Sequence, residues 1–193
     1  MIAAGPDAPT LCGDWTVRDL AAHLVIRERR PDTGPGILIS PLAGYTERVR
    51  RNTAKRPFDE LVDEVRNGPP IWSPLWPVDA LVNTTEMFVH HEDVRRAAPG
   101  WEPRALAAKD EAALWAAVRR MGKMAYRNAL VTVILATPDG QKLTARETGD
   151  RTVVLLGPPS ELLLHAFGRD EVRLDAEGAK ADIESIMALD RSV

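Results

Sequence analysis

Two kinds of hydrophobic periodicity divide the chain. From Asp14 to about Asn128 apolar residues recur three and four positions apart, the spacing of amphipathic helices. From about Leu130 onward, short β-branched runs lie between turn residues instead. The sequence therefore predicts an α+β protein, with helices over residues 1–127 and a smaller mixed domain over residues 128–193.

The first part contains five predicted helices. The first runs from Thr16 to Arg29; it is opened by Thr16-x-x-Asp19, whose side chains can satisfy the free amides of the first turn, and is stopped by Pro31. The others are predicted over residues 42–53, 57–66, 78–97 and 106–126. Residues 68–77 contain four prolines and two tryptophans, so we expect an extended loop there.

Short strands dominate the second part. A Pro138-Asp139-Gly140 turn between two β-like runs predicts a hairpin, because proline presets one dihedral angle and glycine supplies the left-handed one. The predicted strands lie over residues 131–136, 142–146, 153–156 and 172–175. Two helices are predicted among them, over residues 160–168 and 179–189.

Composition excludes several classes of protein. Hydrophobic residues make up 45% of the 193 residues, charged residues make up 27%, and the formal net charge is −3. This balance is typical of an ordinary globular protein and lacks the basic excess of nucleic-acid-binding proteins. No apolar run approaches the roughly 18 residues of a membrane span, and the first residues lack the pattern of a signal peptide. We therefore expect a cytoplasmic protein without a nucleic-acid or membrane partner.

Three residues are candidates for metal binding. Glu86 and His90 are four positions apart, so on a helix their Cβ atoms lie roughly 6 Å apart and both side chains can hold one ion. His23 lies beside Leu20 and Leu24 at the edge of the inward stripe of another predicted helix. A third ligand from a second helix would leave one side of the ion open, as a catalytic zinc requires.

Each candidate also has a structural explanation. His23 on a helix edge can be a hydrogen-bonded core residue, and a Glu-x-x-x-His pair can be an ordinary surface pair. Asp93, three positions after His90, either accepts the second ring hydrogen of His90 or lies at the surface. Cys12 is the single cysteine, which excludes an internal disulfide and a cysteine-built zinc cage. The sequence therefore favours metal ligands of the imidazole and carboxylate type, with Cys12 either a buried side chain or a reactive thiol.

Three motifs together resemble one known family. They are Trp15-x-Val-x-Asp19-Leu20-x-x-His23-Leu24, then Glu86-x-x-x-His90-x-x-Asp93, then Glu161-Leu-Leu-Leu-x-x-x-Gly168-Arg169. Their order and separation resemble the mycothiol-dependent maleylpyruvate isomerase family, an actinobacterial branch of the DinB-like metal-binding superfamily. The resemblance extends from about Pro9 to the C-terminal helix.

The resemblance implies a DinB-like helical bundle that binds a divalent metal, usually Zn²⁺, followed by a small α/β domain similar to sterol-carrier folds. The metal ligands of the family correspond to His23, Glu86 and His90. An arginine of the C-terminal domain faces the active site in the family, and Arg169 is its best counterpart. The implied co-substrate is mycothiol, whose thiolate attacks a small electrophilic substrate in an isomerase or S-transferase reaction.

The chain also departs from this family. Bundles of the family begin with a helix upstream of the segment at Pro9, whereas about eight residues precede Pro9 here. If that helix is absent, either another subunit or the C-terminal domain must fill the apolar groove that it leaves, and because an exposed groove favours association, a homodimer is one of these two expectations. Three functions are open at this point: a thiol-dependent enzyme, a non-catalytic metal-binding or regulatory protein, and a hydrolase that uses a zinc-bound water.

Overall fold

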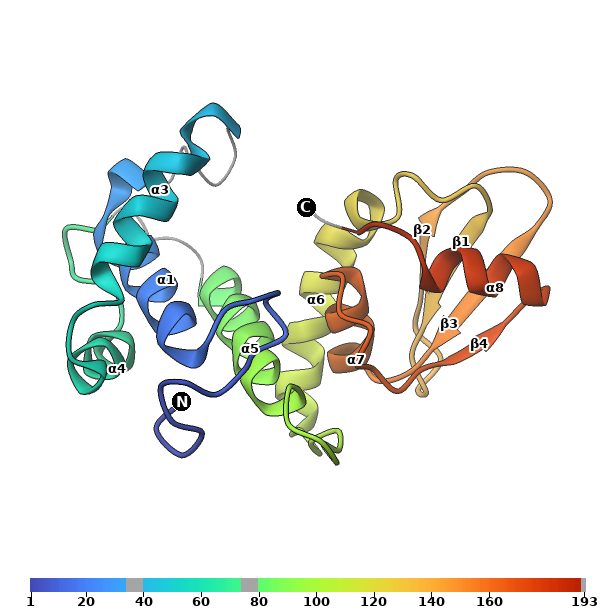
Figure 1. The fold of residues 1–193 in the computed structure, drawn as a ribbon. Coiled ribbons are helices and arrows are strands. Elements are labelled where there is room, and N and C mark those ends of the chain that lie inside the picture. The colour runs from blue at the N-terminus through green and yellow to red at the C-terminus, as the bar shows by residue number, and fades with distance from the viewer. Residues whose placement is uncertain (34–39, 74–79, 192–193) are drawn as a thin grey trace. The chain divides into compact units, whose positions relative to one another are not determined.

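The computed structural model describes residues 1–33, 40–73 and 80–191. Helices α1 to α5 come first, and a four-stranded mixed sheet with interspersed helices follows, which confirms the α+β class (Figure 1). The chain forms two compact units, Met1–Trp101 and Glu102–Val193. Among the described residues, no helix is both long and apolar enough to cross a membrane.

Helix α1 is the centre of the first unit. Its capping box is present as predicted, since Asp19 N donates to Thr16 Oγ1 and Thr16 N donates to Asp19 Oδ2. The helices of this unit and a short 3-10 turn are α1 (Val17–Arg29), η1 (Pro31–Thr33), α3 (Ser40–Thr53), α4 (Phe58–Asn67) and α5 (Ala80–Arg96). The main core cluster joins α1 to α4 through Ala21, Ala22, Leu24, Val25, Ala54, Leu61 and Val65.

Residues 8–16, the segment before α1, pack against both α1 and α5. Val17 and Leu20 of α1 form a second core cluster with Val94 of α5, against which Cys12 and Trp15 pack. The backbone amide of Leu11 donates to the carbonyl oxygen of Asp93 at 3.0 Å. Residues 8–16 therefore bridge the two helices that carry the candidate ligands.

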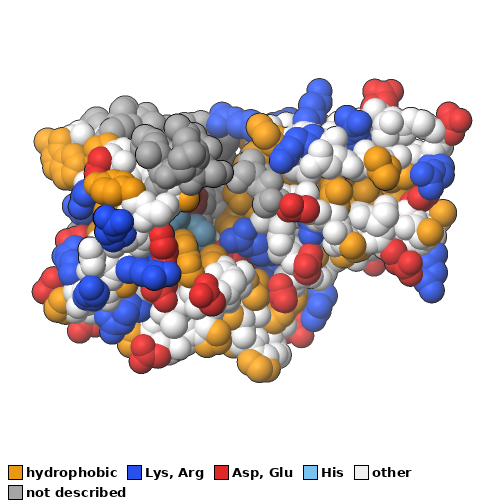
Figure 2. Space-filling view, turned by 45° about the horizontal axis from the view of Figure 1, so that its top comes forward, with side chains coloured by type: hydrophobic (Ala, Val, Ile, Leu, Met, Phe, Trp, Pro, Cys, Tyr) orange, Lys and Arg blue, Asp and Glu red, His pale blue; other side chains and the backbone are white. Residues whose placement is uncertain are grey.

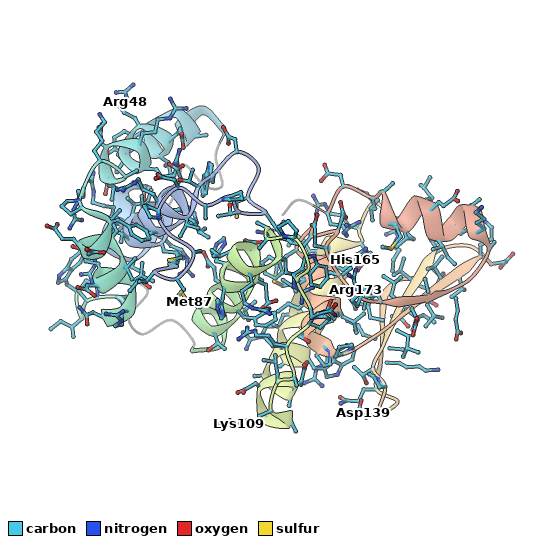
Figure 3. All side chains as sticks on the ribbon, turned by 60° about the horizontal axis from the view of Figure 1, so that its bottom comes forward. Arg48, Met87, Lys109, Asp139, His165 and Arg173 are labelled. Carbon is cyan, nitrogen blue, oxygen red and sulfur yellow. The ribbon has the colours of Figure 1, made fainter. Side chains whose placement is uncertain are left out.

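A mixed sheet organises the second unit. Its elements are α6 (Ala108–Ala125), β1 (Thr132–Ala136), β2 (Lys142–Arg146), β3 (Thr152–Leu156), α7 (Pro159–Ala166), β4 (Asp175–Glu177) and α8 (Lys180–Met187). The strand order is β2-β1-β3-β4, with β1 parallel to β3 and the outer pairs antiparallel. The predicted hairpin joins β1 to β2, and Asp139 lies at its tip (Figure 3).

Helix α6 belongs to this second unit. A Cβ atom on Gly122 would lie 3.0 Å from Leu143 and 3.6 Å from Leu135, so the helix approaches β1 and β2 closely. The sequence places the domain boundary after residue 127, whereas the division between the compact units precedes α6. The apolar stripe of α6 faces the sheet and α7, a choice of partner that helical periodicity does not specify.

The last strand lies further along the chain than the sequence indicates. The predicted strand at residues 172–175 is wrong by about three positions, because β4 covers Asp175–Glu177. The amides of Val172 and Arg173 donate to Asp170 O and Glu161 Oε2 instead of a neighbouring strand. The start of the predicted helix 78–97 and residues 74–77 of the predicted loop lie outside the described residues; Trp72 of that loop is 61% exposed.

Charged side chains cover the surface without a dominant sign. On the face drawn in Figure 2, acidic and basic groups are interspersed, as expected from a net charge of −3.

The interior of the second unit holds a buried polar pair. Tyr126 Oη lies 2.6 Å from His165 Nδ1, and both side chains are fully buried. His165 is labelled in Figure 3.

The buried His165 makes the second unit sensitive to acid. Burial, helped by the positive charge of Arg191, lowers the pKa of His165 from 6.5 to about 3. The unfolded chain therefore binds a proton below pH 6.5 that the folded chain does not, and stability is lost as the pH falls from 6.5 to about 3.

We expect the double variant Tyr126→Phe, His165→Leu to lose less stability over this pH range than wild type, by more than about 1 kcal/mol, because each pKa unit corresponds to about 1.4 kcal/mol. Replacing both partners leaves neither polar group unpaired. Urea unfolding at a series of pH values measures the difference. Parallel pH profiles for the two proteins would contradict this account of His165.

Candidate metal centre

Two helices bring the three predicted ligands together. His23 projects from α1, and Glu86 and His90 project from successive turns of α5. One ligand atom from each residue can be chosen so that all three lie within 4.8 Å of one another. The side chains are half-buried, with exposures of 16% for His23, 24% for Glu86 and 13% for His90. The cluster is therefore shielded but still reachable from solvent.

Glu86 lies between the two histidines. Its Oε1 atom is 4.0 Å from Nε2 of His23 and 3.8 Å from Nε2 of His90. These distances are too long for hydrogen bonds. Nitrogen and oxygen ligands of a tetrahedral zinc lie about 3.3 Å apart, so a contraction of roughly 0.5 to 0.7 Å would bring Oε1 of Glu86 to ligand spacing from each of the two histidine nitrogens. The donor set fits a divalent ion.

Arg27 fixes the second oxygen of Glu86. The guanidinium of Arg27, one turn after His23 on α1, forms an ion pair with Oε2, so that Oε1 remains directed at the histidines. Burial alone would raise the pKa of Glu86, but His90 and Arg27 outweigh burial and hold it below its ordinary value. The carboxylate is therefore ionised at neutral pH, as a metal ligand must be.

His23 is a neutral imidazole at neutral pH. Burial lowers its pKa to about 4, and the positive charges of His90, Arg27 and Arg50 add to this effect against the opposing charge of Glu86. The ring packs between two aromatic neighbours, with centroids 5.2 Å from Trp15 and 5.6 Å from His90. The neutral form of imidazole is the one that binds metal ions, and the two neighbouring rings hold His23 in place.

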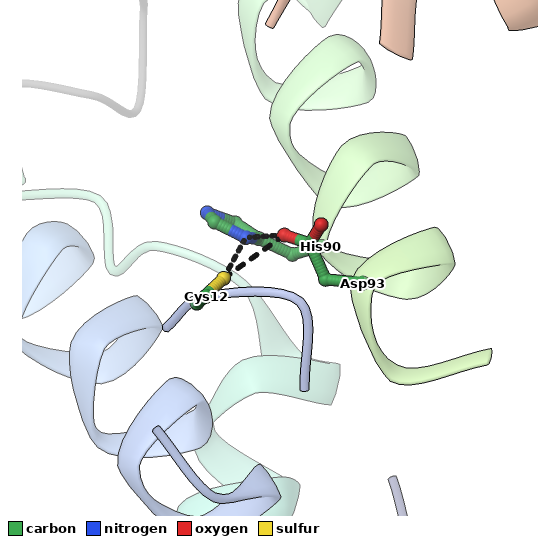
Figure 4. A group of neighbouring side chains, drawn as sticks. All are labelled: Cys12, His90 and Asp93. Atoms are coloured by element: carbon green, nitrogen blue, oxygen red, sulfur yellow. Dashed lines mark hydrogen bonds and ion pairs between the residues drawn. The ribbon is translucent and has the colours of Figure 1, made fainter. Parts of the chain in front are cut away.

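His90 is held at both edges of its ring. While Nε2 faces Glu86, Nδ1 lies 2.9 Å from Oδ2 of the fully buried Asp93 (Figure 4). Cys12 Sγ donates to the same carboxylate oxygen at 3.0 Å. Burial alone would lower the pKa of His90, but its interactions with Asp93, Cys12 and Glu86 outweigh burial and raise it to about 10.

Asp93 therefore occupies the supporting position that the sequence left open. A carboxylate on the far nitrogen of a metal-binding histidine fixes the ring orientation and makes the ligand more basic. His91, the next residue of α5, is exposed and is not part of the group.

Cys12, His90 and Asp93 do not form a nucleophilic triad. In such a triad the histidine contacts the nucleophile through one nitrogen and the carboxylate through the other. Here the thiol, at 3.9 Å, and the carboxylate both face Nδ1, and Nε2 is directed toward Glu86. The arrangement has donor atoms around a point, which suits ion binding rather than proton relay.

Arg169 lies in the second unit, after α7. Its Nη1 atom donates to the carbonyl oxygen of Phe167 at 2.6 Å. Arg169 also lines a surface cavity of about 470 Å³ together with Asp170, Leu189 and Arg191. Its assignment as a catalytic residue stays a prediction.

Two residues of the centre, Arg27 and Cys12, are not among those that the sequence predicts for it. Arg27 is four positions after His23, so helical spacing could have indicated that it shares the ligand face. Cys12 gave no such signal, because it lies before α1 in a segment without periodicity and reaches His90 through tertiary contacts. With Cys12 beside Asp93, the potential ligands extend beyond imidazole and carboxylate.

The ion pair between Arg27 and Glu86 should weaken metal binding, because it places a positive charge next to a dication. We expect Arg27→Met to bind Zn²⁺ about threefold to tenfold more tightly, the size of a screened charge–charge interaction over several ångströms. Competition with a chelator of known affinity measures the change. Arg29→Met is the matched control, since Arg29 contacts Glu64 and the carbonyl of Gly68 instead. Unchanged or weaker binding by Arg27→Met would show that Arg27 mainly positions Glu86.

Comparisons of the chain with protein-family models, with curated proteins and with solved structures found no match. A functional proposal for this protein therefore depends on the residues of the centre, their distances and their charges.

Proposed function

We propose that the protein is a divalent-metal-binding enzyme of the mycothiol-dependent maleylpyruvate isomerase type, acting as a thiol-dependent isomerase or S-transferase. The observation that carries the proposal is the convergence of His23 from α1 with Glu86 and His90 from α5. Two separate helices supply the same three residues that the resemblance to this family implies as ligands. A chance core histidine and a chance surface pair would have no reason to meet.

The charges of the donor set support a catalytic rather than a structural ion. Two imidazoles and one carboxylate leave a bound dication with a net positive charge. Arg27, paired with the other carboxylate oxygen of Glu86, adds a further positive charge next to the ion. Such an ion supplies Lewis acidity and favours the deprotonated form of a thiol or a water. Three protein ligands leave a coordination position for that molecule.

Each neighbouring side chain has a role in this proposal. Asp93 orients the His90 ring through Nδ1, and Arg27 orients Glu86 through Oε2. Trp15 packs against the His23 ring and limits its movement. Arg169 of the second unit stays the catalytic residue that the resemblance implies.

The proposed fold of each unit and the proposed partners come from the same resemblance. The first unit would be a DinB-like bundle, the second would be similar to sterol-carrier folds, and the partners would be mycothiol and a small electrophile. The competing proposal is a non-catalytic metal-binding protein of the same fold. The two proposals share the ion and differ in whether an external thiol reaches it.

Metal content tests the ion. We expect wild-type protein to hold about one Zn²⁺ per chain, and we expect His23→Ala and Glu86→Gln to lose at least tenfold in affinity, because each removes a direct ligand. His91→Ala is the matched control on the same helix and should keep the ion. Elemental analysis after dialysis against a weak chelator gives the content. Equal metal content in all four proteins would rule out this centre.

A thiol titration tests the enzyme proposal. The experiment uses Cys12→Ser protein loaded with Co²⁺, so that the chain contributes no thiol of its own. We expect mycothiol or a simpler thiol to produce a thiolate-to-cobalt charge-transfer band that saturates at about one thiol per ion. His91→Ala in the same background should behave identically. A cobalt-loaded protein without this band would favour the non-catalytic alternative.

A further inference from the structure

A second group of donor atoms lies on the other edge of the His90 ring. Nδ1 of His90 is 2.9 Å from Asp93 Oδ2, Cys12 Sγ is 3.0 Å from the same oxygen, and Sγ is 3.9 Å from Nδ1 (Figure 4). The three atoms belong to two segments far apart in the sequence, the stretch before α1 and the middle of α5. They surround one point from three sides.

These distances are close to those of ligands around one ion. Nitrogen, oxygen and sulfur ligands of a tetrahedral zinc lie about 3.3 to 3.6 Å apart. The separations of 2.9 and 3.0 Å here are shorter than this range and the separation of 3.9 Å is longer, each by about 0.3 to 0.4 Å, so the side chains need to rearrange by only a few tenths of an ångström. The Glu86 group is wider, with two separations of 3.8 and 4.0 Å.

We propose that Cys12, Asp93 and Nδ1 of His90 form a second metal site, selective for a thiophilic divalent ion such as Cd²⁺, and that this site and the Glu86 site cannot be filled together. The exclusion depends on the proposed function, because it requires His23, Glu86 and Nε2 of His90 to bind an ion. The existence of the second site does not.

The donor types set the selectivity. A thiolate is a soft ligand and binds the softer ion Cd²⁺ more tightly than the borderline ion Zn²⁺, whereas imidazole and carboxylate ligands alone do not give this preference. A thiolate and a carboxylate also neutralise a dication completely, while the Glu86 site provides one negative charge with Arg27 beside it. Asp93 is fully buried, which favours a neutral assembly over a charged one. Cys12 is partly exposed, so an ion can reach it.

The shared imidazole produces the exclusion. A neutral histidine has a lone pair on one ring nitrogen and a hydrogen on the other. An ion on Nδ1 therefore leaves the hydrogen on Nε2, where it faces Glu86 and blocks the first site. An ion on Nε2 leaves the hydrogen on Nδ1, directed at Asp93. Before an ion binds, His90 beside Asp93 carries a hydrogen on both ring nitrogens. Binding at the second site then releases the thiol hydrogen of Cys12 and the Nδ1 hydrogen of His90 to solvent as protons, the Nε2 hydrogen stays on the ring, and no redox step is involved.

Cadmium titration tests the second site, because thiolate-bound Cd²⁺ absorbs in the ultraviolet and Cys12 is the only thiol of the chain. We expect wild-type protein to develop this band up to about one ion per chain. Cys12→Ser should lose the band, and Asp93→Asn should weaken binding at least tenfold. His23→Ala and Glu86→Gln are matched controls that disable the first site and should keep the band.

Size-exclusion chromatography of the cadmium-loaded protein separates this result from bridging between chains. We expect the elution volume to be the same with and without the ion. A band that appears only with a change of size, at one ion per two chains, would overturn the proposal. So would wild-type protein that binds Cd²⁺ without a thiolate band.

Zinc competition tests the exclusion. Preloading wild-type protein with Zn²⁺ should lower its apparent affinity for Cd²⁺ at least tenfold, and Glu86→Gln should show a much smaller effect. Simultaneous binding of both ions would overturn the exclusion. If Zn²⁺ does not bind at all and the cadmium band persists, the proposed function fails while the second site stands. If Zn²⁺ binds through Glu86 and no thiolate band appears, the second site fails alone.

Discussion

The centre depends on the hydrogen bond between His90 and Asp93. The side chain of Asp93 holds Nδ1 of His90 at 2.9 Å, and its backbone carbonyl accepts the amide of Leu11 at 3.0 Å. One residue of α5 thus orients the imidazole and anchors the segment before α1. Because that segment leads directly into α1, the same anchor helps place His23 opposite His90. Ligand geometry and the packing of the first unit are therefore coupled.

Several charged side chains of helix α5 are buried. Besides Asp93, it buries Glu92 and Arg96, which pair at 2.8 Å, and Arg96 also lies 4.4 Å above the ring of Trp101. Breaking a buried ion pair by removing one partner costs about 3 to 5 kcal/mol, whereas apolar replacements of both partners are often tolerated. The Glu92–Arg96 pair and the ring of Trp101 therefore help to fix the C-terminal end of α5, the helix that carries Glu86 and His90.

Local chemistry made much of the fold predictable. The cap at Thr16, the Pro-Asp-Gly turn before Gln141 and the spacing of Glu86 and His90 each act within a few residues, so the sequence indicates them directly. The position of α6 and the contact of Cys12 with His90 depend on which surfaces meet in three dimensions, and no periodicity encodes that choice. The shift of the last strand has the same origin, because side-chain and loop partners take the amides before it.

The most direct test of the account is a crystal structure of the zinc-loaded protein with anomalous data collected on both sides of the zinc absorption edge. We expect one strong anomalous peak about 2.0 to 2.2 Å from Nε2 of His23, Oε1 of Glu86 and Nε2 of His90. In the same crystals, Asp93 should remain bonded to Nδ1 of His90. A zinc-loaded crystal in which the anomalous signal lies away from His23 and Glu86 would contradict the account.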